Sequence, residues 1–334
     1  MDEEDIRPAA LMREKVWAVE HDKRFLLERR SQFVSVKCPA CDSSDSEAWG
    51  EKEGFSYRKC VQCATQFMSP RAPEDVLEEF YVQSKNYEVW NRSIFPATEQ
   101  IRMEKIFRPR ALQTVSLCKQ FDVAGGTLLE IGAAFGTFCE ALRDAAYFER
   151  VVAVEPTPDL AETCRAKGFE TYQQTIERLS FPSEGADVVV AFEVIEHLFD
   201  PGAFMKQAAR FLRPGGLLVC SCPNGLALGT LTLGVEARVV DHEHLNYTNP
   251  RSIVKLLERC DLECLVVTTP GELDVNLLVN QISEQPSLSV DCPLVAQILP
   301  DPDTRIQNLL QEFLKEARLS SHMWFVARKP ISKK

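Results

Sequence analysis

The chain alternates short apolar runs with amphipathic stretches over most of its length. Apolar runs that predict strands lie at 127–131, 151–155, 170–172, 186–192, 217–222, 262–268 and 323–327. Amphipathic stretches that predict helices lie before, between and after them, at 98–122, 137–146, 158–167, 201–213 and 304–317. Strands that alternate with helices in this way indicate a doubly wound α/β fold with a mostly parallel sheet.

The start of the chain predicts a separate helix. A polar lead is followed by an amphipathic stretch that extends to about residue 36. Apolar residues that could line one face of this helix are Leu11, Val16, Val19, Phe25 and Leu26. We expect that face to pack against the body of the protein.

Twelve cysteines are present, and four of them have the spacing of a metal site. Cys38 and Cys41 form one C-x2-C pair, and Cys60 and Cys63 form a second pair after eighteen intervening residues. Each pair can form a tight turn that presents two thiolates, and four thiolates complete a tetrahedral zinc shell. We therefore expect a structural zinc ion in a small ribbon whose folding depends on the metal. The other cysteines are scattered through apolar segments, which favours a reducing, cytosolic compartment over disulfides.

The turn after the strand at 127–131 has the arrangement that holds nucleotide-like ligands in α/β folds. Gly132 and Gly136 space this turn, and a helix opens at Thr137. A dinucleotide site would follow the pattern G-x-G-x-x-G, but Ala134 occupies the second glycine position and Thr137 the third. A different nucleoside ligand is therefore favoured.

Two acidic residues at strand ends indicate which chemical groups that ligand contains. Glu130, two residues before Gly132, would repel a pyrophosphate but suits an ammonium group. Glu155 ends the next apolar run, at the place where a carboxylate can bind the two hydroxyls of a ribose. An adenosine with a cationic amino-acid tail, S-adenosylmethionine (SAM), satisfies both acids.

With this turn and these two acids, the sequence resembles the class I SAM-dependent methyltransferases over residues 127 to 329. The resemblance implies SAM as cofactor and a Rossmann-like, mostly parallel sheet of seven strands whose last strand runs antiparallel. The residues that it implies in cofactor binding are Glu130, Gly132, Ala133, Gly136, Glu155, Thr175, Ile176, Phe192 and Glu193. Thr175 and Ile176 are expected against the adenine, and Phe192 and Glu193 beneath the methionine part.

The cysteine module resembles a further feature of one methyltransferase group. The ribbon runs into Pro70-Arg71 and an acidic helix from Pro73, as in the N-terminal module of enzymes that modify sugars or glycan precursors. The resemblance implies that the aromatic-rich link 81–90, which contains Tyr87, lies over the acceptor side. We expect four parts: a helical segment (1–36), the zinc ribbon (37–72), a linker with helices (73–122), and the methyltransferase domain (123–334), whose insertion at about 272–320 would contribute to an acceptor lid.

Methyl transfer from a sulfonium requires an acceptor held in line and, for a hydroxyl or carbon acid, a base. His197 lies in a Glu-x-x-Glu-His-Leu segment that resembles the family segment whose histidine faces the acceptor pocket. Glu243 and His244 resemble the pair that serves as base and sugar contact in the branched-sugar C-methyltransferases. His244 and His197 are therefore both candidate general bases. If this segment is extended, Glu243 points away from its histidine neighbours, and a metal site at His242-x-His244 is disfavoured because no further histidine lies nearby in sequence.

Composition narrows the class of partner. Hydrophobic and charged residues make up 45% and 26% of the chain, as in ordinary globular proteins, and the net charge is -11. The acidic balance disfavours RNA as a partner. No apolar run reaches the length of a membrane span, and the acidic start is unlike a signal peptide. We expect a cytoplasmic enzyme with a small-molecule acceptor, with neither nucleic acid nor a membrane as partner.

Two other classes of function stay open beside a SAM-dependent methyltransferase of a small, sugar-containing acceptor. Zinc modules precede some RNA base methyltransferases, although this chain has Glu193-Val194-Ile195-Glu196 in place of their Asn-Pro-Pro-aromatic segment. The third interpretation is a non-catalytic SAM-binding or zinc-ribbon interaction protein.

Overall fold

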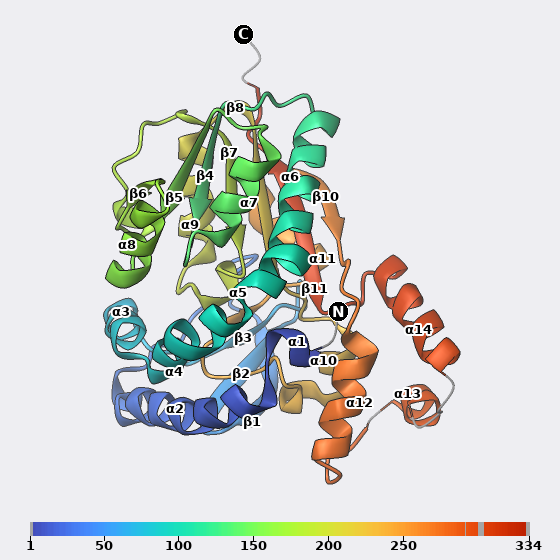
Figure 1. Cartoon of the computed structure of the whole chain (residues 1–334). Helices are drawn as coiled ribbons and strands as arrows, with labels where there is room; N and C mark the ends of the chain where they lie inside the picture. The colour runs from blue at the N-terminus through green and yellow to red at the C-terminus, as the bar shows by residue number, and fades with distance from the viewer. Residues whose placement is uncertain (1–2, 291, 300–303, 332–334) are drawn as a thin grey trace.

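The computed structural model describes residues 3–290, 292–299 and 304–331, and its centre is a seven-stranded sheet (Figure 1). In the order β10-β11-β8-β7-β4-β5-β6, the five strands from β8 to β6 are parallel, and β11 is antiparallel to both of its neighbours. The strands are β4 (Thr127–Ile131), β5 (Arg150–Val154), β6 (Glu170–Tyr172), β7 (Ala186–Phe192), β8 (Leu212–Pro223), β10 (Glu263–Thr268) and β11 (His322–Arg328). The expected Rossmann-like α/β fold is confirmed, including its antiparallel last strand.

Helices cover both faces of this sheet because successive side chains of a strand point to opposite faces. The helices are α6 (Arg108–Gln120), α7 (Thr137–Ala145) and α8 (Pro158–Ala166) on one face and α9 (Pro201–Phe211) and α11 (Pro250–Glu258) on the other. Leu128 packs with the first layer and Leu129 with the second. Burial on both faces explains why continuous apolar runs predicted the central strands. None of the helices in the described part of the chain is long and apolar enough to cross a membrane.

The N-terminal helix α2 (Ala9–Glu28) packs against the body of the protein through Leu11, Phe25 and Leu26 of the predicted apolar face, but Val16 of that face does not pack. Val16 is 65% exposed, whereas Asp22 is buried. Asp22 accepts a hydrogen bond from Ser84 Oγ (2.5 Å) and bonds of 2.9 Å from the first two backbone N–H groups of α4 (Lys85–Val89). The prediction for Val16 was wrong because a buried carboxylate that caps the next helix, and not apolar spacing alone, orients α2.

A second, four-stranded antiparallel sheet joins the cysteine-rich segment to the C-terminal half of the chain. Its strands, in the order β1-β2-β3-β9, are β1 (Ser46–Lys52), β2 (Phe55–Cys60), β3 (Gln66–Met68) and β9 (Asn246–Tyr247). Because β9 pairs with β3, the loop that precedes β9 is held against the first 72 residues of the chain. In Figure 1 this sheet and α2 lie below the central sheet.

A nearly continuous helical run connects the two sheets. Its parts are α3 (Glu74–Gln83), α4, a π-helical turn (Trp90–Ile94), α5 (Phe95–Arg102), a second π-helical turn (Met103–Phe107) and α6. The helix expected over 98–122 is therefore the second half of a longer run. Each π-helical turn ends two residues before a proline, Pro96 or Pro109. Proline lacks the N–H for the i−4 bond, and a wider turn accommodates that loss.

The insertion consists of α12 (Asp274–Glu284), α13 (Pro293–Ile298) and α14 (Thr304–Glu316). Residues 291 and 300–303 of the expected insertion, and the chain ends 1–2 and 332–334, lie outside the described residues. Gln281 of α12 accepts a hydrogen bond from the backbone N–H of Arg238 (3.0 Å) and donates one to Glu236 O (2.7 Å). These bonds attach the insertion to the segment after α10 (Leu228–Leu233).

Replacing Arg71 with methionine is expected to lower the free energy of unfolding by about 2–4 kcal/mol. The buried guanidinium donates to Met68 O (2.9 Å), Asn246 Oδ1 (3.0 Å) and Phe199 O (3.3 Å), so it joins the four-stranded sheet to the loop before α9. Methionine would leave these acceptors unpaired. Denaturant unfolding measures the effect, with Arg165→Met on the exposed side of α8 as a control that changes by less than about 0.5 kcal/mol. Equal losses in the two variants would contradict this role.

Candidate active site

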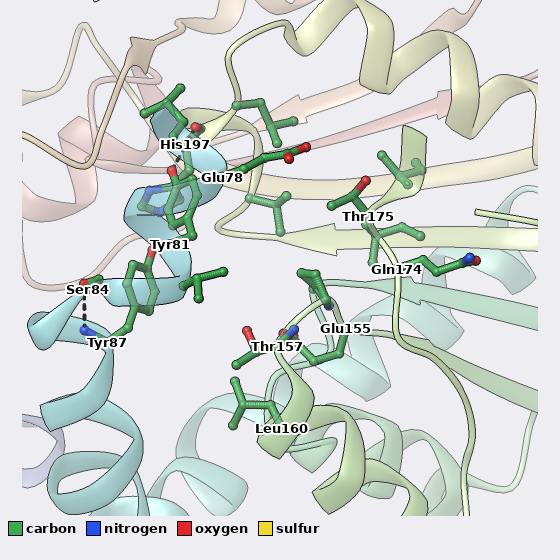
Figure 2. A pocket seen from close by; sticks show the side chains of 18 of the residues that line it. Glu78, Tyr81, Ser84, Tyr87, Glu155, Thr157, Leu160, Gln174, Thr175 and His197 are labelled. Carbon is green, nitrogen blue, oxygen red and sulfur yellow. Dashed lines mark hydrogen bonds between the residues drawn. The ribbon is translucent and has the colours of Figure 1, made fainter. Parts of the chain in front are cut away.

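A cavity of about 1340 Å³ lies at the carboxyl ends of β4, β5 and β7, next to helices α3 and α4. Residues of its wall include Ile131, Gly132, Phe135, Glu155, Thr157, Leu160, Gln174, Thr175, Ile176, Glu193, Val194, His197, Tyr81 and Tyr87. Figure 2 shows Glu155 and Thr175 on one side of the cavity, with Tyr81, Tyr87 and His197 on the other. The carboxyl ends of parallel strands are where open α/β sheets bind ligands.

The glycine-spaced turn predicted after β4 is present, and its conformation requires glycine. Gly132 has a φ of +78° and Gly136 a φ of +68°. A Cβ on Gly132 would lie 2.9 Å from a methyl group of Val194. The backbone of the turn can therefore approach a ligand closely, and α7 begins directly after it at Thr137.

Glu155 lines the cavity in a fixed orientation. Its Oε2 accepts a hydrogen bond from the backbone N–H of Ala134 (2.8 Å), and its Oε1 accepts one from that of Thr157 (2.8 Å). Burial raises the pKa of Glu155, and these bonds act in the opposite direction. Each carboxylate oxygen keeps a further lone pair, so the group can accept hydrogen bonds from two ligand hydroxyls.

Four predicted cofactor residues do not line the cavity: Glu130, Ala133, Gly136 and Phe192. Glu130 is 5% exposed and accepts a hydrogen bond from the thiol of Cys139 (2.8 Å). Burial raises the pKa of Glu130 to about 8, so the carboxyl is mostly protonated at pH 7. The predicted cofactor residues that do line the cavity are Gly132, Glu155, Thr175, Ile176 and Glu193.

Glu193 belongs to a polar cluster that the sequence analysis missed. Its Oε1 accepts a hydrogen bond from Ser221 Oγ (2.6 Å) and lies 3.3 Å from His322 Nδ1 and 3.5 Å from Arg110 Nη2. Burial opposes ionisation of Glu193, but His322 and Arg110 outweigh it and lower the pKa. Trp324 Nε1 donates to His322 Nε2 (2.9 Å), which leaves the imidazole proton on Nδ1, facing Glu193. These residues come from α6, β8 and β11, so no local motif indicates the cluster.

The two candidate bases are neighbours, with ring centroids 4.8 Å apart. His197 lines the cavity and its Nδ1 lies 3.1 Å from Glu243 O, whereas His244 is not among the lining residues and its Nδ1 lies 2.9 Å from Val239 O. A carbonyl oxygen only accepts, so both Nδ1 atoms carry the proton and both Nε2 atoms present a lone pair. Burial lowers the pKa of His197 to about 3, so this imidazole is neutral near pH 7.

The segment 241–245 is a turn and not the extended strand that the sequence analysis considered. Asp241 Oδ1 accepts hydrogen bonds from the backbone N–H groups of Glu243 (3.0 Å) and His244 (2.9 Å). The side chain of Glu243 is hydrogen-bonded to Asn86 of α4 and is not among the residues that line the cavity.

The acceptor side of the cavity is aromatic. Tyr81 and Tyr87 pack edge to face, with ring centroids 5.8 Å apart, and Tyr81 donates to His197 O (3.0 Å; Figure 2). Burial raises the pKa of Tyr87 well above its ordinary value, so its phenol is neutral at pH 7. The described residues of 272–320 do not line this cavity, so the lid expected from the insertion is not found there.

The four cysteines of the predicted zinc site lie together beside the second sheet. The sulfur atoms of Cys38, Cys41, Cys60 and Cys63 are all within 4.8 Å of one another. Asp42 and Ala64 follow the two pairs with φ values of 62° and 57°, so both tight turns form without glycine. Four thiols at this spacing suit a tetrahedral ion with Zn–S bonds of about 2.3 Å.

Comparison with known proteins agrees with the fold and the turn. The family model described as "Methyltransferase domain" matches residues 103–267. A ubiquinone biosynthesis O-methyltransferase of Xanthomonas oryzae is 28% identical over 158 residues, which cover 43% of this chain and 65% of that protein. A protein of the same name from a Methylobacterium species is 36% identical over 162 residues, 45% of this chain and 64% of its own length. The chain thus spans just under two thirds of the length of these relatives.

A solved structure of a SAM-dependent methyltransferase from Thermotoga maritima is 17% identical, with a TM-score of 0.47, and the match covers 73% of this chain and 99% of that one. The family match spans the glycine-spaced turn, Glu155 and His197. Residues 103–267 thus match a methyltransferase domain, and the strand order and the turn geometry of this segment agree with that match.

Proposed function

We propose that this protein transfers the methyl group of SAM to a small acceptor held against His197, Tyr81 and Tyr87. The observation that carries the proposal is one cavity with a cofactor-type carboxylate, Glu155, on one side and an imidazole with two phenols on the other. A nucleotide sugar or glycan precursor is the first candidate acceptor, supported by the resemblance of the cysteine module. A phenolic hydroxyl is the second, supported by the aromatic wall and by the names of the relatives.

The cofactor is proposed to lie across the ends of β4, β5 and β7. Glu155 would accept hydrogen bonds from the ribose hydroxyls, and Thr175 and Ile176 would contact the adenine. The backbone of the turn at Gly132 would lie along the methionine part of SAM. Ala133 and Gly136 would not contact the cofactor directly but would maintain the conformation of the turn. Glu130 would attract the ammonium group, and Glu193, with Phe192 beside it, would lie near the methyl group.

The protein's part in the reaction is positioning and proton removal, since SAM supplies the electrophile when it is bound. His197 is the better placed of the two candidate bases because its Nε2 carries a lone pair and its side chain reaches the cavity. The ring of His244 packs next to the ring of His197, with centroids 4.8 Å apart, and so helps to hold it in place. We assign to Glu243 the role of orienting this loop and the ring of His197. Its backbone carbonyl oxygen accepts a hydrogen bond from the Nδ1–H group of His197. The four cysteines would hold a structural zinc ion that takes no part in catalysis.

Binding and turnover together test this function. Titration calorimetry with SAM is expected to give one site, with no heat from nicotinamide dinucleotide. A survey with labelled methyl groups across nucleotide sugars, glycan intermediates and small phenols is expected to label at least one of them. Binding without turnover of any acceptor would favour the non-catalytic alternative, and tight, salt-sensitive binding of bulk RNA would favour an RNA substrate.

Replacing Glu155 with alanine is expected to weaken SAM binding by about 30-fold to 100-fold. The variant loses hydrogen bonds to two hydroxyls and the anchor of the turn at Ala134, which together are worth roughly 2–3 kcal/mol. Calorimetry measures the dissociation constant. Glu162→Ala, on the exposed side of α8, is the matched control and should leave SAM affinity unchanged. A Glu155→Ala variant that binds SAM as the parent does would exclude the ribose contact.

SAM affinity is expected to rise with pH up to about pH 8. Burial raises the pKa of Glu130 to about 8 in the free protein, and a nearby cation favours the ionised form. Binding therefore releases a proton below pH 8, and affinity falls by up to about tenfold per pH unit as the pH drops. Calorimetry in two buffers of different ionisation enthalpy at pH 7 counts that proton. Glu130→Gln should release none, and proton release that persists in this variant would place the titrating group elsewhere.

A further inference from the structure

Glu193 ends a chain of polar contacts that crosses three neighbouring strands of the central sheet, β11, β8 and β7. Glu193 follows β7, Ser221 lies on β8, and His322 and Trp324 lie on β11. His322 and Trp324 are two positions apart, so their side chains point to the same face of the strand. The topology thus brings four residues from distant parts of the chain to the carboxyl end of β7, where Glu193 lines the cavity.

Trp324 fixes the state of the His322 ring. Its indole Nε1–H donates to His322 Nε2 (2.9 Å), and Trp324 is 7% exposed. An indole nitrogen donates and does not accept, so a proton on Nε2 would face the indole N–H without a partner. The neutral imidazole with its proton on Nδ1 is therefore favoured. Burial also lowers the pKa of His322, although the carboxylate of Glu193 acts in the opposite direction.

The Nδ1 proton of His322 faces one oxygen of Glu193. This oxygen, Oε1, lies 3.3 Å from His322 Nδ1, accepts a hydrogen bond from Ser221 Oγ (2.6 Å) and lies 3.5 Å from Arg110 Nη2. All of these contacts are made with Oε1. Because the Glu193 side chain is 39% exposed and lines the cavity, Oε2 is the oxygen that is left for a ligand.

The backbone of Glu193 supplies a second, independent observation. Its φ is +54°, in the left-handed region that residues other than glycine seldom adopt. Its N–H donates to Ser221 O (3.0 Å), which continues the pairing of β7 with β8 and holds this conformation. Strain of this kind persists where the surrounding structure fixes a residue, and it is concentrated at ligand sites. Glu193 is thus held by its backbone as well as by its polar contacts.

We propose that His322 and Trp324 are positioning residues that hold the carboxylate of Glu193 with Oε2 toward the sulfonium of bound SAM. The inference rests on the proposed function, which places Glu193 near the transferred methyl group. Neither His322 nor Trp324 is among the residues that line the cavity, so both act through the carboxylate. A fixed carboxylate favours the charged sulfonium of SAM over the uncharged thioether of the product, S-adenosylhomocysteine. The chain of contacts would therefore help the enzyme to select SAM in the presence of its product.

The surrounding groups determine how this chain responds to pH. Burial opposes ionisation of Glu193, but His322, Arg110 and Ser221 outweigh it and lower the pKa, so the carboxylate is charged between pH 6 and pH 8. Without the Nδ1–H of His322 this pKa should rise, and the preference for the sulfonium should fall as the pH falls. The other titratable groups near Glu193 or His322 are His244 in the loop before β9, Glu196 in the 3-10 turn Ile195–His197, and Asp274 on α12.

A comparison of SAM with S-adenosylhomocysteine isolates the effect of Glu193. The two ligands share the ribose and the ammonium group, so the ratio of their dissociation constants cancels the contributions proposed for Glu155 and Glu130. Titration calorimetry of the full-length, zinc-loaded protein is expected to give the same ratio at pH 8 and pH 6. His322→Phe keeps a ring but removes the donor, and its preference for SAM should fall about threefold to tenfold at pH 6 and less at pH 8. His322→Asn keeps an N–H donor and should restore the parent ratio within about twofold.

Nitrogen-15 NMR of the histidine rings tests the chain in the absence of SAM. The His322 ring, identified by its nuclear Overhauser contact with the Trp324 indole, should carry one proton, on Nδ1, at both pH 8 and pH 6. An unperturbed histidine, with a pKa of about 6.5, is mostly protonated on both nitrogens at pH 6. In Trp324→Phe the donor to Nε2 is lost, and the ring should become protonated at pH 6. Trp17→Phe, which removes a 63% exposed indole on α2, should leave the His322 signals unchanged.

The outcomes separate this inference from the proposed function. A parent protein that binds neither ligand would overturn the proposed function, and with it the role of Glu193 beside SAM. SAM binding with an unchanged ratio in a folded His322→Phe variant, or a ratio that a folded His322→Asn variant does not restore, would overturn the inference and leave methyl transfer standing. If these variants fail to fold, as a melting curve shows, the NMR spectrum of the parent decides. A proton on Nε2, or a doubly protonated ring at pH 6, would overturn the inference.

Discussion

Replacing Cys63 with serine is expected to strip the protein of bound zinc and to lower its melting temperature by about ten degrees or more. A structural zinc site contributes about 10–16 kcal/mol to the folding of a small module, and loss of one thiolate removes much of that. The effect should spread beyond the ribbon because Cys63 O accepts a hydrogen bond from Asn249 Nδ2 (3.0 Å), the cap of α11. Ribbon unfolding would also release β3 from β9 and so disturb the loop that carries His244.

Metal analysis of the purified protein, a melting curve and limited proteolysis measure this effect. The parent protein should contain one zinc ion, and the variant should be cleaved first between residues 36 and 66. Cys264→Ser is the matched control, because Cys264 is half-buried on β10 and lies outside the cysteine cluster. Zinc content that is unchanged in Cys63→Ser, or lost equally in the control, would show that the four cysteines do not form the site.

The sequence predicted the central sheet closely because its strands are buried on both faces. The apolar run at 186–192 matches β7 at both ends, and β4 matches 127–131. Strand ends in turn placed Glu155 and Glu193 at the cavity, since ligand sites follow the carboxyl ends of parallel strands. Local pattern was sufficient for each of these features.

Features that depend on contacts between distant segments could not be predicted in this way. The pairing of β9 with β3 gives no periodic signal, because β9 consists of two residues. His244 therefore seemed to belong with His242, although its ring lies against His197. Arg110 and His322 meet Glu193 from helix and strand ends far away in the chain. Their positions depend on the topology of the sheet and not on their sequence neighbours.

Replacing His197 with alanine is expected to lower kcat/KM for methyl transfer to a hydroxyl acceptor by about 10²–10⁴-fold, with SAM affinity unchanged. Its Nε2 carries a lone pair, its side chain lines the cavity, and the substitution removes this candidate base. Burial holds the pKa of His197 at about 3, so the parent enzyme should show no loss of rate near pH 6.5 as the pH falls. A pH-rate profile with a break at that value would instead indicate an exposed, ordinary histidine as the base.

A control variant and a contradicting outcome complete this test. Glu162→Ala, on the exposed side of α8, does not line the cavity and should retain the parent rate. A His197→Ala rate within about threefold of the parent would exclude the role of His197 as the base, because even modest acid–base catalysis contributes more than that.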